Sequence, residues 1–440
     1  MVTFRWTLLA LAAVAPISAF AECDLKVTSL HTVDADAASH RPKLGETYYM
    51  RVNWTVTGTP SGPYDIKFEM ANRTHVWRLT TGAGNFYGFV GWKLPLDTPF
   101  PIKVTLDAAN EQADTDRTSN VRTETVRPVL PTSAITWYGA KTIYAKHSAS
   151  VTMGPTSNWS RLIMLSGTPK SETFQTVLNR TSTNGTLIST EPTAYPAMML
   201  DMPNPPAGAT QSIIQHFKLK QKNCKINPNK ILDDWAAFET LPTDIMHWTK
   251  PETVVPSTDP AIAAFVARTL PKEYKTKLSP VKAARRVYLG VVKELTYKTP
   301  AALNAVTVLN LKWGDCGGFT TLYVASLRSM GIPARMRSGF GTGTNNWHVW
   351  PEIYMPSVGW IPQDPTWSDG IDPDGTYAYY FANLDDLTNR CSLGTGNTFK
   401  IPTLGFTSNI FQSFTYWGYW SERGADSFSY EVKLSDVPIP

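Results

Sequence analysis

The sequence predicts an α+β protein in which two β-rich modules precede an α+β domain. Short runs that alternate apolar and polar residues fill residues 22–130, and similar runs resume over 131–230. Helix-forming segments followed by strand-like segments fill residues 231–440. A chain of 440 residues is also long enough for two or three domains.

Residues 1–21 have the layout of a secretory signal peptide. Arg5 supplies a positive charge, residues 7–15 are apolar, and an A-F-A sequence at 19–21 resembles a cleavage site. A membrane anchor is the alternative, but the apolar stretch is shorter than the roughly 20 residues that span a bilayer, and Pro16 interrupts it. We therefore expect a secreted or periplasmic protein without a membrane span.

The composition excludes several classes of partner. The chain is 42% hydrophobic and 18% charged, which is typical of a globular protein. Its net charge of +5 is spread out, without the basic stretches that nucleic-acid binding requires, so nucleic acid is not an expected partner. No Cys-x-x-Cys pair occurs, and the acidic segment SDGIDPDG lacks the acceptor glutamate of a calcium loop. We expect neither a metal nor a cofactor.

Residues 22–130 are expected to form an immunoglobulin-like β-sandwich. Runs such as TYYMRVNWTVTG and PIKVTLDAAN alternate in polarity, and the turn clusters TGTPSGP and TTGAG separate such runs. The segment RPVLPTS, with two prolines, is expected to be a linker. Strand signals resume in ITWYGAKTIYAK and QSIIQHFKLKQ, which predict a second β-rich module over 131–230.

The helices of the α+β domain, residues 231–440, are predicted from their ends. Asp259-Pro260 and Ser279-Pro280 each place an N-cap residue before a proline at the first helical position. A third helix should begin at or just after Cys316 and stop at Gly331-Ile332-Pro333. Its apolar spacing predicts one buried face, which comprises Phe319, Leu322, Tyr323, Ser326 and Met330. The strand-like segments ARMRSGF, HVWPEIYMP and GWIPQDPTW then predict an antiparallel sheet.

The chain contains four cysteines, which are Cys23, Cys224, Cys316 and Cys391. Cysteines tend to pair in an oxidising compartment, and four of them allow three pairings, among which sequence alone does not choose. We expect a bridge between Cys224 and Cys391, because it would clamp the second β-rich module to the α+β domain. Cys23 would then be left unpaired.

Cys316, in the segment GDCGG, has the surroundings of a nucleophile. The positive end of a helix dipole and the unpaired N–H groups at a helix start stabilise a thiolate, and the same groups can hold an oxyanion. Gly314 and Gly317 leave the approach to the sulfur free of side chains. A helix-start cysteine by itself is more often structural, so further residues must support a catalytic role.

A nucleophilic cysteine needs a base, and the base needs an orienting partner. His348 is the only histidine after Cys316, and it begins a predicted strand. A turn at 357–359 leads into a strand that can pair back as a hairpin, which brings Asp364 within reach of the imidazole. Cys316, His348 and Asp364 are therefore the candidate catalytic residues.

The segments GDCGGFTTLYVASLRSMGIPAR and HVWPEIYMPSVGWIPQDPTW closely resemble the transglutaminase-like superfamily of cysteine enzymes. The resemblance is strong over about 260–370 and looser over 131–230 and NRCSLGTG, and the N-terminal sandwich lies outside it. The matching positions are Gly314 to Cys316, Arg328, Gly331 to Arg335, His348 to Tyr354, Gly359-Trp360 and Asp364 to Thr366.

The resemblance implies a papain-like, transglutaminase-like catalytic core that performs acyl transfer through a thioester. Cys316 would be the nucleophile, His348 the general base and then the general acid, and Asp364 the residue that orients the imidazole. The backbone N–H of Cys316 would supply one oxyanion donor. Trp313 and Tyr297 are candidates for the second donor, although core packing is the more common role of such aromatics.

Three functions fit this pattern. The first is a secreted cysteine hydrolase that cleaves peptide or amide bonds, and the second is a crosslinking transglutaminase that uses a lysine amine as acceptor. The third is a non-catalytic binding protein of the same fold, which an intact triad disfavours. The calcium sites and long β-barrel domains of animal crosslinking enzymes are not evident, which favours hydrolysis. The expected partner is a protein or peptide substrate, and the oligomeric state is left open.

Overall fold

The computed structural model is a mixed, sheet-rich protein with several helices. It describes residues 22–33, 42, 48–70, 73–92, 99–127, 132–190, 195–370, 378–396, 399–401, 406–408 and 414–440. The expected signal peptide, residues 1–21, lies outside the described residues. The chain divides into two compact units, an N-terminal unit that ends at Arg127 and a second unit that runs from Pro128 to Pro440.

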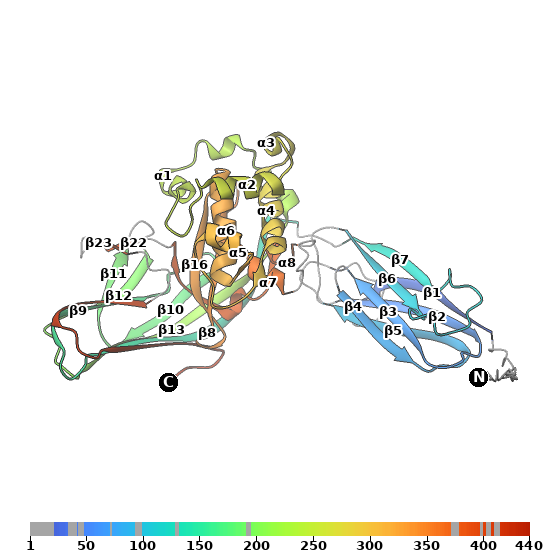
Figure 1. The fold of residues 1–440 in the computed structure, drawn as a ribbon, viewed down its shortest axis with the longest axis horizontal. Helices are drawn as coiled ribbons and strands as arrows, with labels where there is room; N and C mark the ends of the chain where they lie inside the picture. The colour runs from blue at the N-terminus through green and yellow to red at the C-terminus, as the bar shows by residue number, and fades with distance from the viewer. Residues whose placement is uncertain are drawn as a thin grey trace, which may run out of the picture. The chain divides into compact units, whose positions relative to one another are not determined.

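The N-terminal unit is a sandwich of two antiparallel sheets, with strand orders β1-β2-β5 and β4-β3-β6-β7 (Figure 1). Every second residue of β2 from Tyr48 to Val56 is buried, as expected for a strand with one face toward a core. The strand that differs from the immunoglobulin constant type is β4, which pairs with β3 rather than with β5. The strands are β1 Cys23–Val33, β2 Tyr48–Gly58, β3 Tyr64–Met70, β4 Arg73–Leu79, β5 Gly84–Trp92, β6 Phe100–Leu106 and β7 Val121–Val126.

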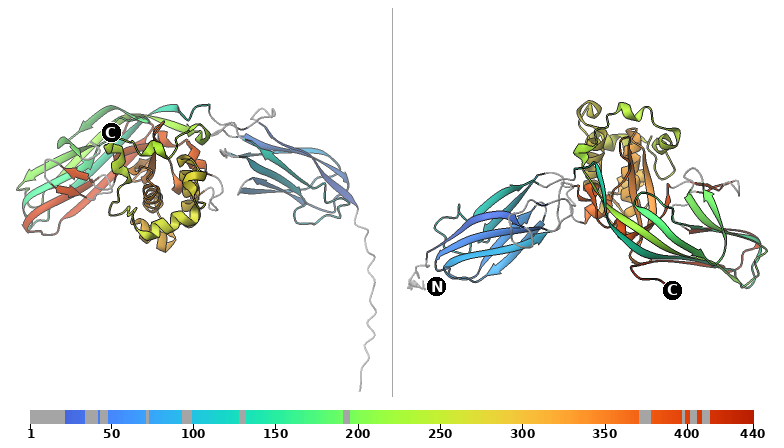
Figure 2. Two further views of the ribbon diagram at one scale, coloured as in Figure 1. Left: turned by 90° about the horizontal axis from the view of Figure 1, so that it is seen from above. Right: turned by 180° about the vertical axis from the view of Figure 1, so that it is seen from behind.

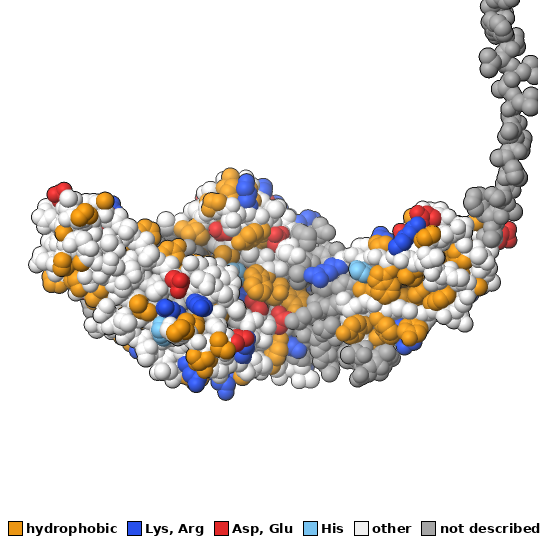
Figure 3. Space-filling model, turned by 90° about the horizontal axis from the view of Figure 1, so that it is seen from below, with side chains coloured by type: hydrophobic (Ala, Val, Ile, Leu, Met, Phe, Trp, Pro, Cys, Tyr) orange, Lys and Arg blue, Asp and Glu red, His pale blue; other side chains and the backbone are white. Residues whose placement is uncertain are grey.

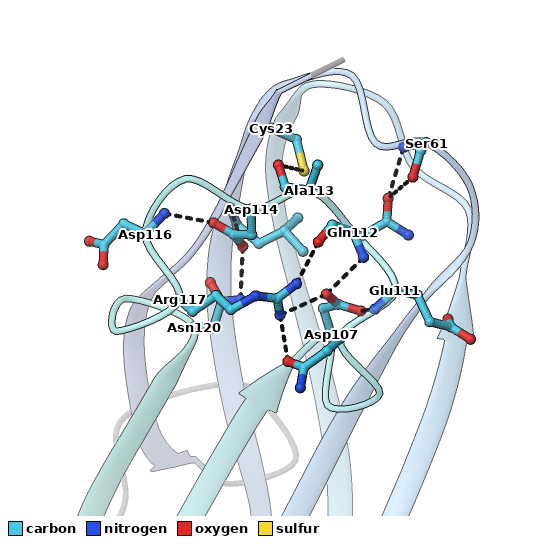
Figure 4. Close-up of polar contacts among 12 residues, drawn as sticks. Cys23, Ser61, Asp107, Glu111, Gln112, Ala113, Asp114, Asp116, Arg117 and Asn120 are labelled. Carbon is cyan, nitrogen blue, oxygen red and sulfur yellow. Dashed lines mark hydrogen bonds and ion pairs between the residues drawn. The ribbon is translucent and has the colours of Figure 1, made fainter. Parts of the chain in front are cut away.

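Two aspartates organise the loops at one end of the sandwich (Figure 4). Asp107 accepts hydrogen bonds from the backbone N–H groups of Glu111 and Gln112 at 2.8 and 3.0 Å, and Arg117 donates to its carboxylate at 3.1 Å. Asp114 accepts from the side chain of Asn120 at 2.8 Å. The Arg117 guanidinium thus supplies the cation that balances the buried Asp107.

The second unit contains two large antiparallel sheets whose strands come from both ends of it. Their orders are β10-β13-β8-β25-β17, with β20 paired to β13, and β11-β12-β9-β24. The sequence predicts a boundary near residue 230, but the sheets cross it, because β25 pairs with β8 and β24 pairs with β9. These strands are β8 Ile135–Thr152, β9 Asn158–Gly167, β10 Gln175–Ser182, β11 Thr186–Thr190, β12 Tyr195–Pro203, β13 Thr210–Ile226, β17 Gly343–Thr344, β20 Asn383–Leu384, β24 Phe414–Glu422 and β25 Ser427–Ser435.

The helices gather on one side of the long strands (Figures 1 and 2). The predicted helix starts at Pro260 and Pro280 are confirmed, and the Asp259 carboxylate accepts from the N–H of Ala261 at 2.8 Å. The α-helices are α1 Thr243–Met246, α2 Pro260–Thr269, α3 Tyr274–Lys277, α4 Pro280–Glu294, α5 Ala305–Leu311, α6 Cys316–Ser329, α7 Pro365–Asp369 and α8 Tyr379–Ala382. The 3-10 helices are η1 Pro228–Lys230, η2 Ala236–Phe238, η3 His247–Thr249 and η4 Leu387–Asn389.

Helix α6 lies at the centre of the largest core. The helices α2, α4 and α5 contact it, as do strands of a four-stranded antiparallel sheet with order β19-β18-β16-β21. Residues 317–328 are therefore buried all round, and not along one face as the sequence predicts. The sheet strands are β16 Ala334–Gly341, β18 Trp347–Met355, β19 Gly359–Pro362 and β21 Arg390–Thr395, and the remaining short strands are β14 Thr296–Tyr297, β15 Trp313–Gly314, β22 Phe399–Ile401 and β23 Phe406–Ser408.

The expected disulfide between Cys224 and Cys391 is wrong for this structure, in which all four cysteines are free. Cys224 on β13 packs in a cluster with Trp350, whereas Cys391 on β21 packs in a different cluster with Phe340. Burial raises the pKa of both thiols, which favours the uncharged form. Both cysteines act as small apolar core residues.

Candidate active site

Cys316 is the first residue of α6 and lies half-buried at its N-terminus. The preceding Asp315 is the N-cap, and its carboxylate accepts a hydrogen bond from the N–H of Gly318 at 3.1 Å. The first N–H groups of a helix have no intrahelical acceptor. The N–H of Cys316 is therefore a candidate oxyanion donor beside the sulfur.

His348 and Asp364 form the tightest side-chain contact of the site. His348 lies near the start of β18, and its Nε2 is 2.6 Å from Oδ2 of Asp364. Asp364 follows β19 directly and is the N-cap of α7, where its Oδ1 accepts from the N–H of Trp367 at 3.1 Å. The hairpin β18–β19 thus brings the aspartate back toward the imidazole, although the carboxylate belongs to a helix N-cap and not to the neighbouring strand.

The electrostatics of the pair favour a protonated imidazole. Burial opposes the charge of His348, but the carboxylate of Asp364 and hydrogen bonds to Asp364 and Cys316 outweigh it, so the pKa of His348 rises to about 9. Burial would raise the pKa of Asp364, yet the charges of His348 and Arg390 hold it below its usual range. Since Nε2 faces Asp364, Nδ1 is the nitrogen available to Cys316.

Cys316 and His348 line the same cavity, which has a volume of about 170 Å³. Gly317 from α6 and Gly339 from β16 also line it, so that little side-chain bulk surrounds the sulfur. Trp347 forms part of the opposite lining, directly before His348. Two of the three predicted site residues therefore share one cavity, and the third, Asp364, is fully buried against the imidazole.

Residues 268–365 match the family model described as the transglutaminase-like superfamily. The match covers Cys316, His348 and Asp364. The chain carries a transglutaminase-like core. The residues that match the model end directly after Asp364, so the N-terminal sandwich and, apart from β17, the strands of the two large sheets lie outside it.

A short part of the chain is similar to YebA of Bacillus subtilis (strain 168), a protein described as uncharacterized. It is 37% identical over 71 residues, which cover 12% of this chain and 10% of YebA, so the chain spans only a small part of the length of this relative.

Three solved structures resemble larger parts of the chain. A candidate cysteine protease from Cytophaga hutchinsonii is 14% identical with a TM-score of 0.49, and the match covers 68% of this chain and 92% of that chain. The periplasmic domain of TgpA from Pseudomonas aeruginosa is 14% identical with a TM-score of 0.26, covering 58% and 100%. The CARDB domain of PF1109 from Pyrococcus furiosus, in complex with di-metal ions, is 15% identical with a TM-score of 0.22, covering 26% and 96%.

Arg390 is a residue of the site that sequence reasoning missed. It lies at the start of β21, where its guanidinium forms an ion pair with Oδ2 of Asp364 at 2.7 Å and donates a hydrogen bond through Nε to Asp386 at 2.6 Å. The arginine is completely enclosed, between the rings of Trp350 and Trp367 at 5.1 and 4.7 Å. Asp364 thus has three partners, which are the imidazole of His348, the guanidinium of Arg390 and the backbone of α7.

A signal for Arg390 was present in the sequence, but it was not specific. NRCSLGTG follows the recognised motifs by more than twenty residues, and an Asp at i−4 from an Arg is common. What marks the pair is its burial, because two aspartates share one guanidinium without access to water. Burial raises the pKa of Asp386, and the charge of Arg390 opposes that rise.

Of the two candidate second oxyanion donors, Tyr297 has the better electrostatic position. Burial raises the pKa of Tyr297, and the negative charges of Cys316 and Asp315 raise it further. Trp313 lies beside it, in the parallel strand pair β14–β15, with Lys298 4.8 Å from its ring centroid. Neither residue is among those that line the cavity.

The other residues of the family pattern support the fold of the core. Arg328 donates to the carbonyl oxygens of Ala334 and Lys250, both at 2.7 Å, and so ties the end of α6 to two loops. Arg335 pairs with the buried Glu352 at 2.8 Å and stacks over Trp360 at 3.9 Å. These contacts give both arginines of the family pattern a role in holding the core together, and they give neither a role in the reaction.

Two wider features concern metals and membranes. Within the described ranges, no group of three or more His, Cys, Asp and Glu side chains is placed to hold a metal ion. None of the helices described here combines the length and the apolar character that a bilayer span requires. On the face drawn in Figure 3, Lys and Arg side chains are scattered among acidic ones and form no continuous stripe.

Proposed function

We propose that the chain is a secreted cysteine-dependent acyl-transfer enzyme that hydrolyses peptide or amide bonds. The observation that carries this proposal is the shared cavity of Cys316 and His348, with the His348–Asp364 bond of 2.6 Å directly behind it. The family match over residues 268–365 supports the same chemistry. Export is supported by the arrangement of charge, apolar stretch and A-F-A sequence over residues 1–21.

The chemistry follows from the roles that these side chains can take. The Cys316 thiolate attacks the substrate carbonyl carbon, and the oxyanion receives the N–H of Cys316 and, in this proposal, the hydroxyl of Tyr297. The C–N bond breaks as the His348 imidazolium donates its proton to the leaving amine, which leaves a thioester. His348 then takes a proton from water, the resulting attack releases a carboxylic acid, and the thiol returns.

A crosslinking transferase would share every step except the last, in which a lysine amine replaces water. No described feature of the cavity distinguishes the two acceptors. Among the residues that line it, Asp315 is the only carboxylate. We propose water as the acceptor and let the experiment compare the two directly.

The test is turnover of casein with and without a fluorescent primary amine, by the wild type and by Cys316→Ala. We expect hydrolysis to exceed amine incorporation, and Cys316→Ala to lose turnover at an unchanged melting temperature. Amine incorporation above hydrolysis would reassign the protein to the crosslinking class. Full activity in Cys316→Ala would contradict the enzyme proposal altogether.

A further inference from the structure

A row of four aromatic side chains extends from the cavity along the outer strands of the two large sheets. The ring of Trp347, in the cavity lining, is 5.6 Å from that of Tyr430, which is 6.4 Å from Phe428, which is 5.8 Å from Tyr416. We call these four residues the aromatic strip. It joins β18 to β25 and β24, which belong to three different sheets.

The strip arises because β25 is longer than the core that covers it. Alternate residues of β25 share one face, and of these Val432 and Leu434 are buried in a cluster against which Trp347 packs. Farther along the same face, Tyr430 is 39% and Phe428 is 56% exposed. Adjacent exposed aromatic rings form a contiguous apolar surface, which is the kind of surface that marks binding sites.

The strip has a parallel centre and inclined ends. The rings of Phe428 and Tyr430 are parallel to within 4°, whereas the rings of Trp347 and Tyr416 are inclined to their neighbours by 67° and 45°. The nearest charges at its far end neutralise one another, because Arg423 pairs with Asp426 at 2.7 Å and the hydroxyl of Tyr416 contacts the same carboxylate at 3.2 Å. The surface therefore favours apolar groups of a ligand over charged ones.

We propose that the aromatic strip binds an extended segment of the polypeptide substrate whose acyl group reaches Cys316. This rests on the proposed function and specifies its substrate class. Alternate side chains of an extended peptide are about 7 Å apart, which matches the ring spacing along β25. At about two residues per ring, the strip accommodates roughly six residues on one side of the reacting bond, with apolar side chains at alternate positions.

A glycan is the rival occupant, because sugar rings also stack on flat aromatic surfaces. The peptide is favoured because the strip is continuous with the cavity of a cysteine that acts on acyl groups, so one chain can occupy both. The two rings on β25 are also spaced by the two-residue repeat of a strand, which is the repeat of an extended peptide and not that of a saccharide chain. The experiment therefore includes a soluble oligosaccharide as a competitor.

The first measurement compares fluorogenic amide substrates of two and eight residues with apolar residues at alternate positions. The wild type should prefer the long peptide by about tenfold or more in kcat/KM, as expected for contacts with exposed aromatic anchors. In Phe428→Ser and Tyr430→Ser this ratio should fall toward one. Leu178→Ser is the matched control, since Leu178 is 49% exposed on β10, at the opposite edge of the same sheet. It should keep the wild-type ratio.

The second measurement does not depend on activity. Binding of the eight-residue peptide to Cys316→Ala is followed by fluorescence anisotropy, and addition of Phe428→Ser should weaken it about tenfold. Binding without turnover in the wild type would contradict the proposed function and leave the strip in place. Equal binding by the Cys316→Ala protein with and without Phe428→Ser, or displacement of the peptide by the oligosaccharide alone, would overturn the strip as a peptide site.

Discussion

At the scale of single residues, the environment of Asp364 determines how it responds to substitution. Its two oxygens contact His348 and the N–H of Trp367 by hydrogen bonds and the guanidinium of Arg390 by an ion pair, so each of these partners presents N–H groups to the carboxylate. An asparagine would have to point its NH₂ group at one of these donors. It would also leave the charge of Arg390 with Asp386 alone.

We therefore expect Asp364→Asn to reduce kcat strongly but less than Cys316→Ala, because an amide oxygen can still accept from the imidazole. The free energy of unfolding should drop by about 1–3 kcal/mol, since a buried donor loses its acceptor. Steady-state kinetics and urea melts test both. If the Asp364→Asn variant is as inactive as Cys316→Ala, His348 requires the negative charge of the carboxylate and not only its hydrogen bond.

Arg390 offers a second prediction at this scale. Arg390→Met leaves the buried Asp386 without its counter-charge and Asp364 with His348 alone, and it should cost about 3 kcal/mol or more in unfolding free energy. Arg390→Met with Asp386→Leu removes one positive and one negative charge together and should recover part of that loss.

The readout that separates positioning from mere stability is the pH profile. The charge of Arg390 lowers the pKa of His348, so its removal should move the alkaline limb of kcat/KM to higher pH. A lower melting temperature with an unmoved limb would make Arg390 a structural residue only. The other charged groups around Asp364 are His348 and Asp386, with the phenol of Tyr380 nearby.

The pKa of His348 also predicts how stability depends on pH. Its folded pKa of about 9 lies above the unfolded value of about 6.5, so its contribution is complete below about pH 6.5 and is lost as the pH rises through 9. Unfolding free energy should fall by about 3 kcal/mol over that window. The contribution of Asp364, whose pKa is lowered, is instead lost in acid. Urea melts between pH 6 and 9.5 give the unfolding free energy at each pH. Its slope against pH should differ between the wild type and His348→Gln, and equal slopes would exclude the ion pair.

At the scale of the elements, two glycines that line the cavity have different reasons to be glycine. A Cβ on Gly339 would lie 2.0 Å from the carbonyl oxygen of Cys391, which is backbone of the paired strand β21. A Cβ on Gly317 would lie 2.4 Å from the end of the Leu303 side chain, which can rotate away. Gly339 is thus required by the sheet, and Gly317 by the open cavity.

Gly339→Ala should therefore lower the unfolding free energy by about 2 kcal/mol or more, because β16 and β21 must separate. Gly317→Ala should change stability little, since helix propensity offsets the displaced leucine. It should nonetheless raise KM, because the methyl group and the moved side chain narrow the cavity. Thermal melts and kinetics of the two variants together test the distinction, and the reverse ranking of their stabilities would contradict it.

At the scale of the whole molecule, the two large sheets depend on the C-terminal strands. The strand β25 pairs with β8 over nine residue pairs, from Ser427 to Ser435, and β24 pairs with β9. A chain that ends after Thr395 would leave β8 and β9 with open edges. It would also uncover the core residues against which Val432 and Leu434 pack. We expect it to be insoluble.

A chain that begins at Pro128, by contrast, keeps every strand of the second unit. It should fold and retain activity on a short substrate, because Cys316, His348, Asp364 and Arg390 all belong to that unit. Expression, circular dichroism and turnover of the two truncations provide the comparison. A soluble, active chain ending at Thr395 would show that the long sheets are independent of their C-terminal strands.

The sequence by itself determined the local features of this protein. Alternation predicts the sandwich strands, Asp-Pro and Ser-Pro predict the starts of α2 and α4, and the motifs around Cys316, His348 and Asp364 mark these three as candidate site residues. The strand and helix signals depend on residues a few positions apart, where chain geometry alone decides which side chains share a face or a cap.

Only the tertiary structure decided what depends on distant segments. It left Cys224 and Cys391 in separate apolar clusters, paired β25 with β8 across nearly three hundred residues, and placed Arg390 behind Asp364 between two tryptophans. It also enclosed α6 on all sides. The physical reason is that strand pairing and core burial depend on the total free energy of the packed unit. Local sequence patterns do not specify which distant segment becomes the partner.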